Sequence, residues 1–319
     1  MTTLILTHSA CFGHDPGPGH PEVPARLRAV LGAIQGLGGI ELAFAEVDAA
    51  EAGALAGAHE TAMIDRVLAA IPAAGYGALD HDTTVSPGSR AAALGAAGAA
   101  LAAVDAVATG AAANAFCAVR PPGHHATRDR AMGFCLFNNA ALAAMRAREE
   151  HHFERVAVVD FDVHHGNGTE DILRGRDGFF YASSHEYPNY PGTGRHSEDG
   201  PCRIVNAPLA PMTSGAAFRT AWSERILPEL VRFRPDFMIV SAGFDGHRKD
   251  PLSMMQLEVA DFAWLTAELR RIAEDRCGGR LVSVLEGGYD LDALAASARA
   301  HVVALASPRD PCDPAGDVA

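Results

Sequence analysis

One segment, residues 155–170, constrains the fold of this chain more than any other. It begins with an unbroken apolar run rich in valine, which predicts a strand buried on both faces. Within a few residues the run gives way to Asp160, Asp162, His164 and His165. Unpaired carboxylates beside a core are costly, so a bound metal ion is the best reason for this pattern. The alternative is a solvated loop whose polar residues cap the next helix.

Length and composition favour one large α/β domain. The 319 residues contain no repeat and no low-complexity linker, so we expect a single domain over residues 1–307 and a flexible tail over 308–319. The net charge of -13 argues against nucleic-acid binding and is compatible with cationic substrates. The six cysteines form no C-x-x-C pair, which predicts neither a disulfide framework nor a thiolate zinc site.

The sequence carries no signal for secretion or for a membrane. Its first residues lack a basic region followed by a sustained apolar stretch, so we expect a cytoplasmic location. Residues 90–113 are rich in alanine, but Arg90, Asp105 and several glycines favour a helix of a soluble protein over a membrane span. Ser89 is expected to cap that helix. Further helices are predicted at about 25–34, 61–70, 140–149, 216–231, 261–274 and 291–304.

Five apolar runs alternate with the predicted helices, which is typical of a parallel sheet built from crossover units. The runs cover residues 115–119, 155–159, 179–183, 237–241 and 281–285. Each run ends in side chains able to do chemistry, namely His124 and His125; Asp160, Asp162 and His164; Ser183 and His185; Asp245; and Tyr289. Ligands of open α/β sheets bind beyond the carboxyl ends of the strands. The convergence of these side chains at one edge favours an enzyme.

Three of these residues form a candidate metal site. Asp162 and His164 are two apart, so in an extended segment both side chains point the same way. Asp245, from a neighbouring strand, would complete a set of three ligands with a position left open for water. That is the arrangement of a catalytic divalent ion, and the mixed oxygen and nitrogen set suits zinc, although ferrous iron or cobalt would also be accepted. For Asp245 the alternative is an aspartate that only forms a turn.

Two histidines and a tyrosine suit the remaining chemistry. His124 and His125 follow a stiff Pro-Pro-Gly turn, and an adjacent pair beside a divalent ion suits proton transfer during amide hydrolysis. Tyr289 lies on a Gly-Gly loop, where its phenol can donate to an oxyanion opposite the metal. Phe134 and Tyr190 can wall a narrow apolar channel. The alternative for the two histidines, Phe134 and Tyr190 is ordinary packing in the core.

Six motifs, in this order along the chain, resemble those of the histone deacetylase family, in particular its class II and bacterial deacetylase-like branch. They are RPPGHHA at 120–126, GFCLFNN at 133–139, DFDVHHGNGT at 160–169, YPGTG at 190–194, GFD at 243–245 and EGGY at 286–289. The resemblance extends from about His8 to Val303. It implies an arginase-like three-layer α/β fold with a central, mainly parallel sheet, and a zinc hydrolase that removes acetyl groups from amines.

The resemblance also implies a role for each matching residue. Asp162, His164 and Asp245 correspond to the zinc ligands. Arginases bind two metals through Asp-x-His-x-Asp, but Gly166 stands where the second aspartate of that motif would be. We therefore expect one catalytic metal.

The catalytic groups follow in the same way. His125 corresponds to the general base and later acid, and His124 to its electrostatic partner, which Asp160 supports. Asn167 occupies the position of the partner of His125, where some branches have aspartate and class II proteins have asparagine. An amide there leaves His125 less basic than a carboxylate would. Tyr289 matches the tyrosine that polarises the substrate carbonyl.

The resemblance further implies an acyl channel and a second cation site. Tyr190 is more often phenylalanine in the family, so its hydroxyl makes the rim more polar. The residues expected in the channel are Gly133, Phe134, Tyr190, Leu252, Gly287 and Gly288. A monovalent cation, expected to be potassium, would bind near Asp160 and Ser183.

The substrate class is left open between two kinds of acetylated amine. Some polyamine-selective relatives carry a glutamate where this chain has Leu252, after Asp250 and Pro251, so acetyl-lysine in proteins or peptides is favoured over acetylpolyamines. Asp82 is either a substrate contact or a turn cap. A non-enzymatic acetyl-lysine reader is a further alternative, although a reader does not need the full set of ligands, histidines and tyrosine. No nucleic-acid or membrane partner is expected, and the oligomeric state is open.

Overall fold

The computed structural model describes residues 2–307, so the predicted tail at 308–319 lies outside the described residues. Its centre is an eight-stranded sheet with the order β2-β1-β5-β10-β9-β6-β7-β8, in which every neighbouring pair of strands is parallel. The strands are β1 (Thr3–Thr7), β2 (Leu42–Glu46), β5 (Asn114–Cys117), β6 (Val156–Asp160), β7 (Phe179–Glu186), β8 (Arg203–Leu209), β9 (Phe237–Ala242) and β10 (Leu281–Leu285).

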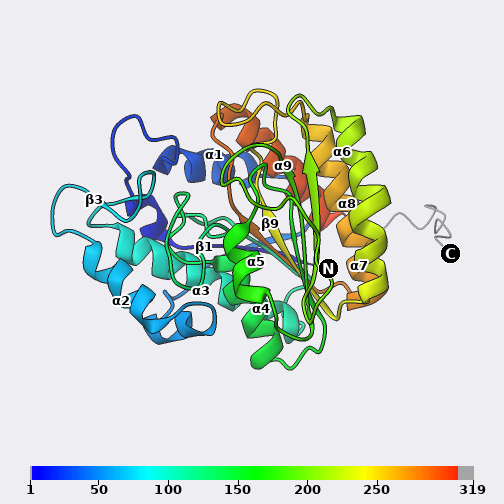
Figure 1. Cartoon of the computed structure of the whole chain (residues 1–319), viewed down its shortest axis with the longest axis horizontal. Coiled ribbons are helices and arrows are strands. Elements are labelled where there is room, and N and C mark those ends of the chain that lie inside the picture. Colours follow the sequence, from blue (N-terminus) through cyan, green and yellow to red (C-terminus); the bar gives the residue numbers. More distant parts are fainter. Residues whose placement is uncertain (1, 308–319) are drawn as a thin grey trace.

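Helices cover both faces of this sheet (Figure 1). They are α1 (Pro24–Ile34), α2 (Thr61–Ala70), α3 (Ser89–Ala108), α4 (Asn139–Glu149), α5 (Asn167–Leu173), α6 (Gly215–Ala221), α7 (Leu227–Phe233), α8 (Val259–Cys277) and α9 (Leu291–Ala306). The helix α9 packs against both α1 and α8, and α3 packs against α4. A short hairpin, β3 (Gly77–Ala78) with β4 (Thr84–Val85), stands apart from the main sheet. The predicted three-layer α/β fold with a central parallel sheet is confirmed.

Burial explains the composition of the central strands. Every residue of β5, β6, β9 and β10 is buried, which is why these strands are mostly apolar on both faces. β2 and β8, which the sequence did not predict, are the edges of the main sheet. β2 is partly exposed, and β8 contains Pro208, which an edge strand tolerates because it has one unpaired side. β1 lies one strand in, between β2 and β5.

The alanine-rich helix differs from its prediction in two details. It ends at Ala108 because Asn114 begins β5. Ser89 is its first residue and not its cap, so that prediction was wrong; Gly88 is the N-cap, and Ser89 Oγ accepts from the Ser86 amide at 2.8 Å. By length and composition alone α3 could cross a membrane, but 61% of its most apolar window is buried within this fold.

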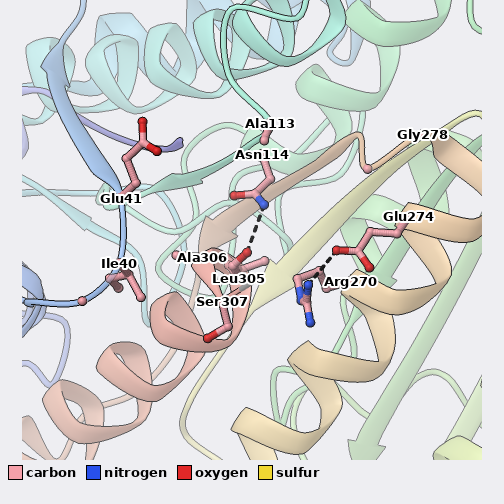
Figure 2. A pocket seen from close by; sticks show the side chains of 12 residues that line it. Ile40, Glu41, Ala113, Asn114, Arg270, Glu274, Gly278, Leu305, Ala306 and Ser307 are labelled. Carbon is pink, nitrogen blue, oxygen red and sulfur yellow. Dashed lines mark hydrogen bonds and ion pairs between the residues drawn. The ribbon is translucent and has the colours of Figure 1, made fainter. Parts of the chain in front are cut away.

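A cavity of about 580 Å³ opens at the amino-terminal edge of the sheet (Figure 2). Its polar side chains are paired partly with one another: Asn114 Nδ2 donates to the Leu305 carbonyl at 3.1 Å, and Arg270 Nη1 donates to Glu274 Oε1 at 2.6 Å. Asn114 is the first residue of β5, and the other three come from the carboxyl-terminal halves of α8 and α9. This cavity is therefore on the edge opposite the polar strand ends described next.

Candidate active site

The carboxyl ends of the central strands bring the predicted polar residues to one edge of the sheet. Asp160, the last residue of β6, is in register with Ser183 of β7 and with Ser241 of β9. Asp245 follows β9 by three residues, and Glu286 follows β10 directly. Because parallel strands end at the same edge, side chains far apart in the sequence become neighbours here.

Asp162, His164 and Asp245 form a buried cluster in which one donor atom from each residue lies within 4.8 Å of the others. His164 Nδ1 is 3.2 Å from Asp162 Oδ1 and 3.1 Å from Asp245 Oδ2. Backbone amides hold the outer carboxylate oxygens: Gly287 donates to Asp162 Oδ2 at 2.8 Å and Val163 donates to Asp245 Oδ1 at 2.9 Å. The inner oxygens and the imidazole nitrogen therefore face a common point.

The electrostatics of this cluster call for positive charge at that point. Burial, together with the nearby Asp162 carboxylate, raises the pKa of Asp245 to about 7. Burial opposes charge on His164, but its hydrogen bonds to Asp162 and Asp245 outweigh burial and raise its pKa to about 10. Two carboxylates and one imidazole are a ligand set for a divalent ion with an open position, so the residues fit a catalytic metal.

Two glycines allow the carboxylates to sit this close to the backbone. A Cβ on Gly243 would lie 2.0 Å from Asp162 Oδ2, and a Cβ on Gly287 would lie 2.1 Å from Asp245 Oδ2. A side chain at either position would displace a carboxylate of the cluster.

The histidine pair lies beside the cluster, and each ring has its own partner. His124 Nδ1 donates to Asp160 Oδ2 at 3.0 Å, and His125 Nδ1 donates to Asn167 Oδ1 at 2.8 Å. Burial opposes charge on His124, but Asp162 and Asp160 outweigh it and raise the pKa to about 10. Burial and the positive charge of His124 lower the pKa of His125 well below its usual value. The two adjacent imidazoles thus favour opposite protonation states.

Tyr289 is held by residues that sequence reasoning did not single out for the site. The Arg26 guanidinium lies over the Tyr289 ring, 4.8 Å from its centre, and Arg26 Nε donates to the Gly288 carbonyl at 2.6 Å. Glu22 Oε1 accepts from Arg26 Nη1 at 3.0 Å, and Glu22 also binds Arg120 through both carboxylate oxygens. This buried ion network connects α1 to the loop that carries Tyr289.

A channel of about 240 Å³ leads to the cluster. Its lining consists of Asp82, His125, Gly133, Phe134, His164, Asn189, Tyr190, Leu252 and Tyr289. The Phe134 ring meets the Tyr289 ring edge to face at 5.8 Å, and the Tyr190 ring meets the His125 ring in the same way at 5.0 Å. Gly133 has a positive φ of 58°, and a Cβ there would lie 2.4 Å from the His125 ring.

Two predicted channel residues have other contacts. Gly287 and Gly288 are not among the lining residues; the first holds Asp162 through its amide, and the second accepts from Arg26. Glu286, which was not assigned a role, accepts from the Gly123 and His124 amides at 2.7 and 3.2 Å. Its position immediately after an apolar run is the same signal that marks Asp160.

An open parallel α/β sheet with a carboxylate and imidazole cluster at its carboxyl edge defines an arginase/deacetylase-like α/β protein. The family model for the histone deacetylase domain matches residues 20–305, and the chain belongs to the histone deacetylase family. The predicted family is confirmed, and with it a hydrolase of the deacetylase and amidohydrolase class.

Individual relatives agree with this assignment. The chain is 37% identical to the chloroplastic histone deacetylase 14 of Arabidopsis thaliana, over 92% of this chain and 74% of that protein. It is 42% identical to the histone deacetylase-like amidohydrolase of Pseudomonas aeruginosa, over 88% of this chain and 73% of that protein. The crystal structure of the HDA15 HD domain superposes with a TM-score of 0.89 at 33% identity, covering 96% of this chain and 89% of that one.

Proposed function

We propose that this protein is a zinc-dependent deacetylase that hydrolyses the amide of acetyl-lysine in proteins or peptides to acetate and a free amine. One observation carries the proposal: His164 of the metal-type cluster, His125 and Tyr289 line the same narrow channel. A candidate ligand, a candidate base and a phenol donor can therefore all reach one amide group. Such a combination is required for hydrolysis and serves no purpose in binding alone.

Zinc would be held by Asp162, His164 and Asp245. When bound, it would polarise the acetamide carbonyl and lower the pKa of a water molecule bound to it. Ferrous iron or cobalt would suit the same donors.

The protein groups around the amide would then share the proton transfers and the developing charge. His125 has its Nδ1 committed to Asn167, so its Nε2 would take the proton from the attacking water and return it to the departing amine. The hydroxyl of Tyr289 would donate to the carbonyl oxygen as negative charge develops there. His124, charged beside Asp160, would stabilise the same negative charge.

Three further parts of the proposal concern the whole protein. Residues 1–307 are proposed to act as one catalytic domain, with potassium bound near Asp160 and Ser183, which are buried and in register on adjacent strands. A cytoplasmic location is proposed because the five cysteines of the described chain are free and buried, as in a reducing compartment.

Acetylated polyamines are the second candidate substrates. Asp82 lines the channel, and Asp80 lies beside it on the same hairpin tip, so a second positive charge on the substrate would find a partner at the mouth. Leu252, an uncharged rim residue, supports acetyl-lysine instead.

The test is a kinetic comparison on protein loaded with one zinc ion per chain. We expect turnover of an acetyl-lysine peptide that exceeds turnover of acetylputrescine and that a hydroxamate abolishes. A preference for acetylputrescine would select the second candidate. If the zinc-loaded protein hydrolysed neither, the enzymatic proposal would fail, and peptide binding without turnover would support a reader.

A further inference from the structure

Two large methionine side chains stand exposed together outside the catalytic channel. Met212 is 59% exposed and Met254 is 54% exposed. The Met212 amide donates to the Met254 carbonyl at 3.1 Å, so the two loops that carry them are joined. The Gln256 side chain donates to the same carbonyl at 3.0 Å. We call Met212 and Met254 the methionine pair.

The backbone of Met212 makes this pair unusual. Met212 has a φ of 66°, in the left-handed region that favours glycine. It follows Pro211 in a turn closed by the Thr213 amide, which donates to the Ala210 carbonyl at 3.2 Å. Turns with a positive φ at the third position usually carry glycine or asparagine there, and proline is common just before it. A long apolar side chain is thus held exposed where glycine would fit with less strain, and such outliers cluster at binding sites.

The loop that carries Met254 also contributes to the channel lining. Leu252 lines the channel, and its amide donates to Asp250 Oδ1 at 3.0 Å. Asp250 Oδ2 accepts from the Tyr289 amide at 2.6 Å, so this loop is fastened to the catalytic loop. Two residues after Leu252, the Met254 amide donates to Glu186 Oε2 at 2.8 Å. The loop therefore passes directly from the channel wall to the methionine pair.

The other side of the pair meets the second channel loop. Glu186 is the last residue of β7, and the chain continues through Tyr187 to Asn189, which lines the channel. The Tyr187 amide donates to the Leu209 carbonyl at 2.7 Å, directly before the turn that carries Met212. Both loops that flank the pair thus also form the channel mouth.

We propose that the methionine pair is a contact surface for an apolar side chain of the polypeptide that flanks the acetylated lysine. The inference rests on the proposed deacetylase function and refines its substrate class to polypeptides with an apolar residue beside the acetylated lysine. Met254 lies two residues from Leu252 of the channel lining, and neither methionine belongs to that lining, so the pair is placed to contact the residues next to an inserted lysine. Methionine side chains are flexible and polarisable, and they suit a surface that accepts several apolar partners.

The experiment compares two substrates on the zinc-loaded, full-length chain. One is an acetyl-lysine peptide with leucine at the flanking positions, and the other is acetyl-lysine amide without flanking residues. The double variant Met212→Gly with Met254→Ser removes both apolar side chains and relieves the positive φ. We expect KM for the leucine peptide to rise about fivefold to tenfold with kcat unchanged, because the variant loses one apolar contact with the peptide. Kinetics on acetyl-lysine amide should not change.

Phe44→Ser is the matched control variant. Phe44 is 47% exposed and lies on β2, the edge strand farthest from β7 and β8, so its loss should leave KM for both substrates unchanged. The single variant Met212→Gly should also melt no lower than the parent, because glycine suits its φ, and this excludes a merely structural role for that side chain. An unchanged KM for the leucine peptide in the double variant would overturn the inference while leaving the deacetylase proposal intact. Absence of turnover by the parent protein on every substrate would instead overturn the proposed function.

Discussion

At the scale of single residues, the hydrogen bond between His125 and Asn167 decides which imidazole nitrogen is available. The Asn167 side-chain oxygen lies 2.8 Å from His125 Nδ1. Because an amide oxygen can only accept a hydrogen bond, His125 Nδ1 carries the proton. Nε2 is then left without a proton on the channel side. Burial and the nearby charge of His124 hold the pKa of His125 low, which keeps that nitrogen ready to accept a proton.

Asn167→Asp should therefore move the pH dependence of catalysis. A carboxylate beside Nδ1 stabilises the imidazolium and so raises the pKa of His125. A base must be deprotonated to act, so activity is lost below its pKa. The acid limb of kcat/KM should accordingly shift to higher pH. A pH–rate profile of the zinc-loaded variant measures this, and an acid limb at the parent position would show that His125 is not the base.

Tyr289→Phe tests the phenol alone. The change removes one donor and leaves the ring, its contact with Phe134 and the packing against Arg26 in place. We expect kcat to fall about 100-fold, or roughly 3 kcal/mol of barrier, as for loss of one oxyanion donor. Bound zinc, measured on the same sample, should be unchanged. Full turnover by the zinc-loaded variant would contradict the role given to this hydroxyl.

At the scale of secondary-structure elements, His301 joins three of them in the core. It lies on α9. Its Nδ1 forms a hydrogen bond with Thr266 Oγ1 of α8 at 2.7 Å, and its Nε2 forms one with Ser283 Oγ of β10 at 2.8 Å. Thr266 donates its own proton to the Phe262 carbonyl, so Nδ1 must be the donor to Thr266 and Nε2 the acceptor from Ser283. Both nitrogens are satisfied only in the neutral ring.

The stability of the fold should therefore depend on pH through His301. Burial lowers its pKa to about 3, against 6.5 in the unfolded chain. Above pH 6.5 the His301 ring is neutral in both the folded and the unfolded protein, so it does not affect the free energy of unfolding. As pH falls from 6.5 toward 3, the unfolded chain binds a proton at His301 that the folded chain excludes, and stability is lost. Between pH 6.5 and 4.5 this amounts to about 2 kcal/mol.

His301→Gln should remove that part of the pH dependence. Urea unfolding of parent and variant at both pH values gives the comparison, because other buried histidines are common to the two proteins. We expect the parent to lose about 2 kcal/mol more than the variant between pH 6.5 and 4.5. Equal losses would show that His301 is not held neutral in the folded protein.

The edge strands of the main sheet, β2 and β8, were not predicted from the sequence for a shared physical reason. The inner strands were visible because burial on both faces demands unbroken apolar runs. The edge strands β2 and β8 face other constraints: β2 is partly exposed, and β8 includes Arg203 and Pro208, so neither shows that pattern.

The candidate site likewise contains residues that the sequence predicted and residues that it did not. The spacing of Asp162 and His164 indicated a shared direction, and the structure has both in one cluster with Asp245. Arg26 gave no such signal, because it lies in the apolar stripe of α1 and meets Gly288 only through the tertiary fold, 262 residues away. Local pattern reveals ligands that share a segment; contacts that depend on the packing of distant elements leave no local trace.

At the scale of the whole molecule, the metal-type cluster connects β6 and β9 at the centre of the sheet. A ligand that binds only the folded state stabilises it by mass action, by about 4 kcal/mol when its concentration is 1,000 times Kd. For a chain of this size that corresponds to roughly 5 °C in Tm.

Removal of zinc with a chelator should therefore lower Tm by about 5 °C, and added zinc should restore it. Thermal unfolding with and without zinc measures the difference. Asp245→Asn serves as the control, since it removes one ligand and should abolish the response to zinc. If the Tm of the parent protein did not change with zinc, that result would argue against a metal at this cluster.

The position of β1 has a consequence for how the protein can be shortened. The family match starts at residue 20, yet Thr3–Thr7 forms hydrogen bonds with strands on both sides and its inner residues are buried. A fragment beginning at residue 20 would lack β1, so the backbone N–H and C=O groups of β2 and β5 that pair with β1 would lose their hydrogen-bond partners. The boundary of recognisable family similarity is thus not a boundary of folding, because Thr3–Thr7 is an inner strand of the central sheet.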